Sequence, residues 1–246
     1  MKRTSEASLK GPAVRIDLVS LFPQMCRAVL DAGVVGKAIE AKLVDVVVTD
    51  PRQFCEDRHG VVDGPPYGGG PGMILRAPPL VMAVESVRRS SARVILMSPT
   101  GATFNQELAQ EFTEEDQLVL VCGRYKGFDE RIVELLAAQE LSLGDFVLSG
   151  GELAALAVVD AVIRRIPGAL GDMDSADGDS FSRGREGLLD AASYTRPPEY
   201  RGLKVPEVLL SGDHAAIDEW RRQSSLARTR ARRPDLLDEH ENESGK

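Results

Sequence analysis

Short apolar runs alternate with segments of helical periodicity along the first two thirds of the chain. Each run is leucine-rich or β-branched and is bounded by Gly, Pro or Asp, which is typical of buried strands. The predicted strands are Val14–Val19, Val44–Val48, Val94–Met97, Leu118–Cys122 and Phe146–Leu148. The predicted helices between them are about Pro23–Ala41, Pro78–Arg89, Asn105–Phe112, Asp129–Ala138 and Gly151–Ile166. This alternation predicts an α/β fold with a parallel sheet.

The pattern changes after the last of these helices. Residues 171–190 are rich in Gly, Ser and Asp and show no apolar period, which indicates a linker or mobile loop. Further on, Asp213 is a good N-cap for a helix to about Gln223, and a second short helix is expected before Pro234. The predicted organisation is a disordered tail (1–12), an α/β domain (13–171), a flexible linker (172–190) and a small all-α domain with an acidic tail (191–246).

The two predicted domains differ in charge. The 246-residue chain has a net charge of -8, which excludes a general polyanion binder, so any contact with nucleic acid needs a local basic patch. Residues 191–233 contain nine basic and five acidic residues. Six arginines within this segment have no acid among them: Arg221, Arg222, Arg228, Arg230, Arg232 and Arg233. They indicate either a phosphate-binding surface or a solvated charged face.

Composition also limits the chemistry and the location. Three cysteines and three histidines, all scattered, do not predict a disulfide framework or a transition-metal site. No apolar run approaches the roughly 18 residues that span a bilayer, and the amino terminus lacks the apolar region of a signal peptide. We therefore expect a cytoplasmic protein with no membrane contact and no metal ligands.

Glycine-rich segments are the strongest local feature. Pro65–Met73 has four glycines in five residues but is neither a P-loop nor a dinucleotide fingerprint, so it is either a tight surface turn or a place of close approach. Three other turns follow predicted strands: Ser98–Gly101, Cys122–Gly127 and Leu148–Glu152. The carboxyl ends of parallel strands are where α/β proteins bind ligands. The three turns are therefore either ordinary strand–helix loops or, as we favour, the backbone lining of one cofactor pocket.

Seven motifs, in order between about Val14 and Leu237, carry a resemblance to a known family. They are Leu21–Pro23, Pro66–Met73, Cys122–Tyr125, Gly144–Glu152, Asp179–Phe181, Tyr194–Pro197 and Val208–Gly212. Together they resemble the bacterial tRNA (guanine-N1)-methyltransferases, the TrmD family of the SPOUT superfamily. The resemblance implies a deep trefoil knot, an exception to the rule that chains avoid knots. It also implies a homodimer whose active sites are shared between subunits.

The resemblance implies S-adenosylmethionine as methyl donor, held by backbone groups of the knot loops. The expected cofactor-binding residues are Ser98, Pro99, Gly101, Gly123, Arg124, Tyr125, Leu143, Gly144, Val147, Leu148, Gly150, Gly151 and Asp190. The substrate would be tRNA, methylated on N1 of the guanosine at position 37, next to the anticodon, in support of reading-frame maintenance. The family also indicates magnesium dependence, although the sequence has no evident protein cage for the ion.

Catalytic and tRNA-binding roles follow from the same resemblance. An Asp base and an Arg that stabilises charge on O6 map onto Asp179 and Arg164. By position alone, Asp179 reads as a solvated loop acid and Arg164 as a cation at a helix carboxyl end. Phe181 would help the loop to pack over the substrate. The basic domain, including Arg221, Arg222 and Arg228, would hold the anticodon stem.

One motif departs from the family pattern. The family usually has Glu where this chain has Lys126, so the charge beside the expected pocket is reversed and the role of that Glu is not carried over. Two other readings therefore stay open: a SPOUT RNA methyltransferase with a different target, and a catalytically silent RNA-binding knot protein.

Overall fold

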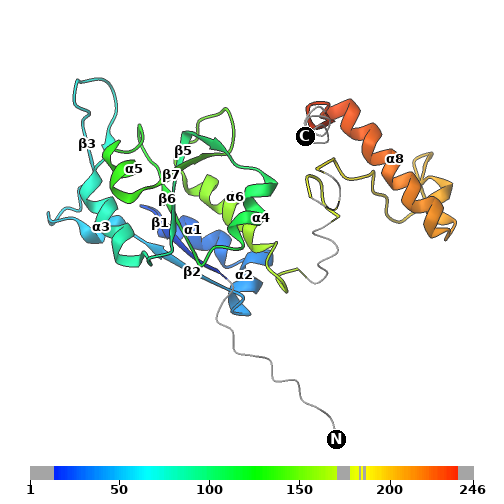
Figure 1. Cartoon of the computed structure of the whole chain (residues 1–246), viewed down its shortest axis with the longest axis horizontal. Helices are drawn as coiled ribbons and strands as arrows, with labels where there is room; N and C mark the ends of the chain where they lie inside the picture. The colour runs from blue at the N-terminus through cyan, green and yellow to red at the C-terminus, as the bar shows by residue number, and fades with distance from the viewer. Residues whose placement is uncertain (1–13, 171–177, 183, 185–186, 238–246) are drawn as a thin grey trace, which may run out of the picture. The chain divides into compact units, whose positions relative to one another are not determined.

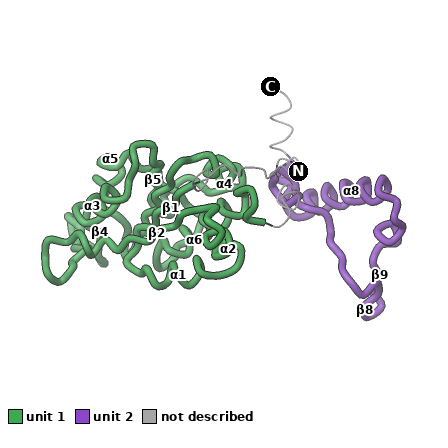
Figure 2. Tube along the Cα trace, turned by 90° about the horizontal axis from the view of Figure 1, so that it is seen from below, with its two compact units in different colours: residues 1–171 green, residues 172–246 purple. Residues whose placement is uncertain are grey.

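The computed structural model describes residues 14–170, 178–182, 184 and 187–237. Contacts between residues divide the chain into two compact units, residues 1–171 and residues 172–246 (Figure 2). None of the helices among the described residues combines the length and apolar character needed to cross a membrane.

The first unit is built on a five-stranded sheet with the order β2-β1-β6-β5-β7 (Figure 1). Every pair of neighbouring strands is parallel, which confirms the predicted parallel α/β fold. Central β6 is buried along its whole length, as expected for a strand covered on both faces. The strands are β1 (Val14–Val19), β2 (Val44–Thr49), β5 (Arg93–Thr103), β6 (Gln117–Cys122) and β7 (Gln139–Ser142).

Helices cover both faces of this sheet, and each face has its own apolar core (Figure 1). Successive side chains of a strand point to opposite faces, so Leu118 and Leu120 enter one core while Val119 and Val121 enter the other. The first core is covered by α1 (Pro23–Leu30), α2 (Gly33–Glu40), α4 (Gln106–Phe112) and α6 (Glu152–Ile163). The second is covered by η1 (Pro51–Phe54), α3 (Ala77–Val87) and α5 (Arg131–Leu136).

One strand and one helix of the first unit differ from the prediction. Phe146–Leu148 is an exposed loop, and the fifth strand is the edge strand β7, which begins with the polar residues Gln139 and Glu140. The single helix predicted over Pro23–Ala41 is two helices, α1 and α2. Gly33 begins α2 with a φ of +63°, a conformation that breaks a continuous right-handed helix.

The glycine-rich segment forms the loop of a hairpin between β3 (Asp63–Gly64) and β4 (Ile74–Leu75). All four of its glycines have positive φ, which explains their use here: Gly68, Gly69, Gly70 and Gly72. After the loop, the Leu75 N–H donates to the carbonyl of Gly127, which joins the hairpin to the loop after β6.

The second unit is organised by one long helix, α8 (His214–Arg232). The Asp213 carboxylate accepts a hydrogen bond from the Ala216 N–H at 3.1 Å, which confirms the predicted N-cap. The predicted end at Gln223 and the separate short helix before Pro234 are wrong, because α8 is continuous to Arg232. Its second half carries the buried residues Ser225 and Thr229, and the Thr229 hydroxyl donates to the Ser225 carbonyl. The unit is not wholly helical, since β8 (Glu199–Tyr200) and β9 (Leu203–Lys204) form a hairpin, followed by η3 (Glu207–Leu210).

Candidate cofactor pocket

Loops at the carboxyl ends of β6 and β7, with part of β5, enclose a pocket of about 420 Å³ in the first unit. This volume lies in the range of roughly 300–1,000 Å³ that is usual for small-molecule sites. Ten residues expected from the sequence to bind the cofactor line it together: Ser98, Pro99, Gly123, Arg124, Tyr125, Leu143, Val147, Leu148, Gly150 and Gly151.

The first pocket segment is a bulge within β5 and not, as predicted, a turn after it. Met97 and Ala102 both lie opposite Leu141 of β7, so residues 98–101 leave the regular ladder. The Thr100 hydroxyl donates to the Glu140 carboxylate at 2.8 Å and so ties the bulge to β7.

Gly101 and Gly144 are not among the residues that line the pocket, which differs from the sequence expectation. Gly101 instead lies against the backbone of β7. The Gly144 carbonyl accepts a hydrogen bond from the Phe146 N–H at 2.8 Å and so turns the loop toward the pocket.

The second segment is the tight turn after β6. The Gly127 N–H donates to the Arg124 carbonyl at 3.0 Å, and Tyr125 within the turn has a φ of +58°, an uncommon conformation for a bulky residue that is often found at functional sites. The Lys126 N–H donates to the Met73 carbonyl at 2.9 Å. A Cβ on Gly72 would lie 2.8 Å from Lys126 Cγ, so the glycine-rich hairpin serves close approach to this turn.

The third segment, residues 143–151, joins β7 to α6. Its side chains Phe146, Val147 and Leu148 are exposed and line the pocket, so they offer an apolar surface to a ligand. The Gly151 N–H donates to the Gly123 carbonyl at 2.7 Å, which holds this segment against the turn after β6.

Charged groups of both signs surround the pocket. Arg124, Lys126, Glu130 and Glu140 line it, and Arg124 forms an ion pair at 2.9 Å with Glu152, which is fully buried at the start of α6. Sequence reasoning missed Glu140 because it missed β7. The signal that could have found it was the short stretch Gln139–Ser142, which lies between a predicted helix and a Gly.

The predicted catalytic and loop residues fall in different units. Arg164 caps the carboxyl end of α6 in the first unit, where its N–H donates to the Asp160 carbonyl. Asp179 belongs to the second unit, in a turn where its carbonyl accepts from the Ser182 N–H. The guanidinium of Arg233 lies 5.8 Å from the ring centroid of half-exposed Phe181.

Asp190, expected near the cofactor, also belongs to the second unit. Its N–H donates to the Ser180 hydroxyl at 2.9 Å, and its carboxylate accepts from the Ala191 N–H at 2.7 Å. Next to it, the Leu189 carbonyl accepts from the Ser225 hydroxyl of α8. The described end of the predicted linker is therefore bonded to the helix of the second unit.

The arginines of α8 differ in their partners. Arg221 pairs with Asp218, and Arg222 pairs with Glu219 at 2.7 Å, which lowers the pKa of the Glu219 carboxyl to about 2 through hydrogen bonds from Arg222 and Gln223. Among the residues that the structure describes, Arg228, Arg230 and Arg232 have no ion pair with a carboxylate. Arg228 Nε is buried and without a hydrogen-bond partner in that same described set.

Metal ligation has no support in the residues described. Within 14–170, 178–182, 184 and 187–237, no group of three or more His, Cys, Asp or Glu side chains could hold a metal ion.

Comparison with known proteins places the chain in a family. Residues 14–239 match the family model of the tRNA (guanine-1)-methyltransferase TrmD. A tRNA (guanine-N(1)-)-methyltransferase of Brevibacillus brevis is 54% identical over 226 residues, which cover 92% of each chain. The corresponding protein of Latilactobacillus sakei is 53% identical, over 92% of this chain and 91% of the relative, and that of Listeria monocytogenes is 52% identical, over 91% and 92%. The chain therefore belongs to the tRNA (guanine-1)-methyltransferase TrmD family.

Proposed function

We propose that this protein transfers a methyl group from S-adenosylmethionine to N1 of the guanosine at tRNA position 37, and so supports maintenance of the reading frame. The observation that carries the proposal is the pocket at the carboxyl ends of the sheet, two of whose three segments contain family motifs, Cys122–Tyr125 and Gly144–Glu152. Membership of the family across residues 14–239 supports the choice of reaction.

The pocket residues fit S-adenosylmethionine. Exposed Val147 and Leu148 supply an apolar surface, and the glycines at 123, 150 and 151 let the two loops that line the pocket pack closely together. Glu140 at the lining offers a carboxylate to the positively charged groups of the molecule. When bound, S-adenosylmethionine supplies an electrophilic methyl group on a sulfonium.

The target nitrogen requires a base. Guanine N1 carries a proton and becomes a good nucleophile only when that proton leaves, and negative charge then builds on O6. We assign removal of the proton to the Asp179 carboxylate and stabilisation of O6 to the Arg164 guanidinium, which stays charged throughout.

Binding of tRNA is assigned to the second unit. The arginines Arg228, Arg230 and Arg232 of α8 have no ion pair among the described residues and so are available to phosphates. Arg221 and Arg222 would exchange their carboxylate partners for phosphate contacts, and exposed aromatic Phe181 would pack near the substrate.

A homodimer with shared active sites, and a trefoil knot through the pocket loops, complete the proposal. Phe22, directly before α1, and Met25 and Val29 within it are exposed and recur at helical spacing, and a second copy would cover them. The guanidinium of Arg124 contacts Phe22 and Met25, so this apolar stripe adjoins the pocket. The described residues contain no cluster of side chains that could bind magnesium, and no step of the reaction is assigned to this ion.

Two alternative functions would give a different result in a methyl-transfer assay. A SPOUT enzyme with another target would methylate a different atom, and a silent knot protein would bind S-adenosylmethionine without transferring the methyl group. The deciding experiment is methyl transfer to tRNA transcripts with and without guanosine at position 37, followed by mass spectrometry of the digested product. A methyl group on N1 of that guanosine supports the proposal, whereas a methyl group on another atom, or no methylation, contradicts it.

A further inference from the structure

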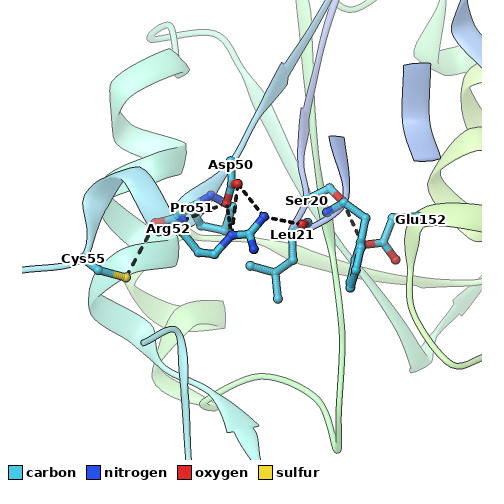
Figure 3. A network of polar contacts seen from close by, with 8 residues as sticks. Ser20, Leu21, Asp50, Pro51, Arg52, Cys55 and Glu152 are labelled. Atoms are coloured by element: carbon cyan, nitrogen blue, oxygen red, sulfur yellow. Dashed lines mark hydrogen bonds and ion pairs between the residues drawn. The ribbon is translucent and has the colours of Figure 1, made fainter. Parts of the chain in front are cut away.

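A buried carboxylate lies directly behind the pocket. Glu152 is the first residue of α6, and its side chain has no exposed surface. The start of a helix favours a negative charge, but a buried carboxylate still needs hydrogen-bond donors. It has two: the Ser20 hydroxyl donates to Oε1 at 2.8 Å, and Arg124 Nε donates to Oε2 at 2.9 Å (Figure 3 shows the bond to Ser20).

Ser20 is a well-placed donor because the residues after β1 are held from two sides. Its hydroxyl oxygen also accepts from the Phe22 N–H at 2.9 Å. On the other side, Arg52 Nη2 donates to the Leu21 carbonyl at 2.8 Å while Arg52 pairs with Asp50 (Figure 3). The hydroxyl that contacts Glu152 is therefore presented by an ordered backbone.

Arg124 links Glu152 to the backbone that lines the pocket. Its guanidinium lies 4.3 Å from the ring centroid of Phe22, and its Nη1 donates to the Ser149 carbonyl at 3.3 Å. A Cβ on Gly150 would lie 2.2 Å from Arg124 Nε, so the guanidinium sits directly against that backbone. Arg124, Ser149 and Gly150 all line the pocket, whereas Glu152 does not.

We propose that Glu152 is a positioning residue for the cofactor pocket: it holds Arg124, and Arg124 holds the Ser149–Gly151 backbone in the shape that binds S-adenosylmethionine. This inference rests on the proposed function. Without the carboxylate, the largely buried guanidinium loses its counter-charge and leaves this position, because an uncompensated buried charge is costly. The two pocket segments are then no longer held at a fixed spacing.

The test uses the full-length protein and the substitution Glu152→Gln, which keeps the volume and one acceptor but removes the charge. We expect the Kd for S-adenosylmethionine, measured by calorimetry, to rise about tenfold or more, as expected when a hydrogen bond between charged groups is removed. At saturating S-adenosylmethionine, kcat should stay within a few-fold of wild type. The matched control is Asp160→Asn, an exposed carboxylate on the same helix, which should change neither value.

A double-mutant cycle separates positioning from general stability. Arg124→Gln should weaken S-adenosylmethionine binding as well, and the double variant should bind no more weakly than Arg124→Gln alone, because Glu152 acts through Arg124. Additive losses would overturn the inference. So would a Glu152→Gln protein that melts at lower temperature but binds S-adenosylmethionine as wild type does.

The same measurements distinguish this inference from the proposed function. If the wild-type protein binds S-adenosylmethionine and Glu152→Gln weakens that binding, the positioning role stands even where no methyl reaches tRNA. If the wild-type protein methylates tRNA and Glu152→Gln has an unchanged Kd, the proposed function stands and the positioning role is overturned. A wild-type protein that does not bind S-adenosylmethionine overturns both.

Discussion

Gly101 of β5 lies so close to the backbone of Glu140 of β7 that a Cβ on Gly101 would come within 2.2 Å of the Glu140 carbonyl carbon. The nitrogen of Leu141 would be 2.3 Å away. Both atoms belong to a strand backbone, which cannot rotate aside as a side chain can. The bulge that presents Ser98 and Pro99 to the pocket therefore depends on glycine at this position.

Gly101→Ala is expected to push the bulge away from β7. The overpacking should lower the free energy of unfolding by about 1–3 kcal/mol and weaken binding of S-adenosylmethionine. Denaturant unfolding and calorimetry measure the two effects. Gly64→Ala in β3 is the matched control, since a Cβ there would meet only Arg76 Cγ at 4.0 Å. Equal behaviour of the two variants would contradict this account of the bulge.

Asp179→Ala and Arg164→Ala are expected to lose most methyl transfer. The reduction in kcat should be roughly 10²–10⁴-fold for the base and roughly 10²–10³-fold for the arginine. Binding of S-adenosylmethionine should change little, because neither residue lines the pocket. Single-turnover transfer to tRNA measures the chemical step. Arg165→Ala is the control for Arg164: Arg165 follows it in the chain and donates to Gln110 at 2.8 Å, so turnover should persist.

Removing the arginines of α8 is expected to reduce the salt dependence of tRNA binding. Each arginine that binds a phosphate should, when replaced, make the slope of log K against log salt shallower by about 0.7–0.9. Alanine variants of Arg228, Arg230 and Arg232 can be compared over a salt series by filter binding. Arg131→Ala in the first unit, where Arg131 already pairs with Asp129, should leave the slope unchanged. An unchanged slope in all three α8 variants would argue for a merely solvated face.

Lys126 is expected to act on tRNA and not on the methyl donor. The residue is exposed beside the pocket, so an interaction of its ammonium with phosphate should be worth about 1 kcal/mol or less, or up to about fivefold in affinity. Lys126→Met should raise the KM for tRNA modestly, and Lys126→Glu should raise it further through repulsion. A changed Kd for S-adenosylmethionine with an unchanged KM for tRNA would reverse this assignment.

Acid should weaken the Arg222–Glu219 pair over a defined pH range. The folded-state pKa of Glu219 is lowered from 4.5 to about 2, so the pair's contribution to stability is complete above 4.5. It is lost as the pH falls through about 2. The free energy of unfolding of the wild type, minus that of Glu219→Gln, should therefore decline between these values. An NMR titration of the Glu219 carboxyl with an ordinary midpoint would contradict the expected shift.

Sequence patterns predicted the sheet where apolar runs were strong and failed where they were weak. β1, β5 and β6 contribute side chains to both cores, and edge strand β2 has a run of valines, so these runs stand out. Edge strand β7 begins with Gln139 and Glu140 and gave no such signal, while the apolar run Phe146–Leu148 looked like a strand but faces the pocket. Apolar residues mark burial or ligand contact alike, and local pattern does not separate the two.

The sequence by itself determined the parallel α/β class, the N-cap at Asp213 and the motifs whose residues line the pocket. Only the tertiary structure decided how these motifs meet. The bulge of β5 against Glu140, the Met73–Lys126 hydrogen bond and the Ser20–Glu152–Arg124 contacts join residues far apart in the chain. Whether a position requires glycine, or whether a carboxylate is buried, depends on which atoms lie next to it in the folded protein. That partner is set by packing and not by neighbours in the sequence.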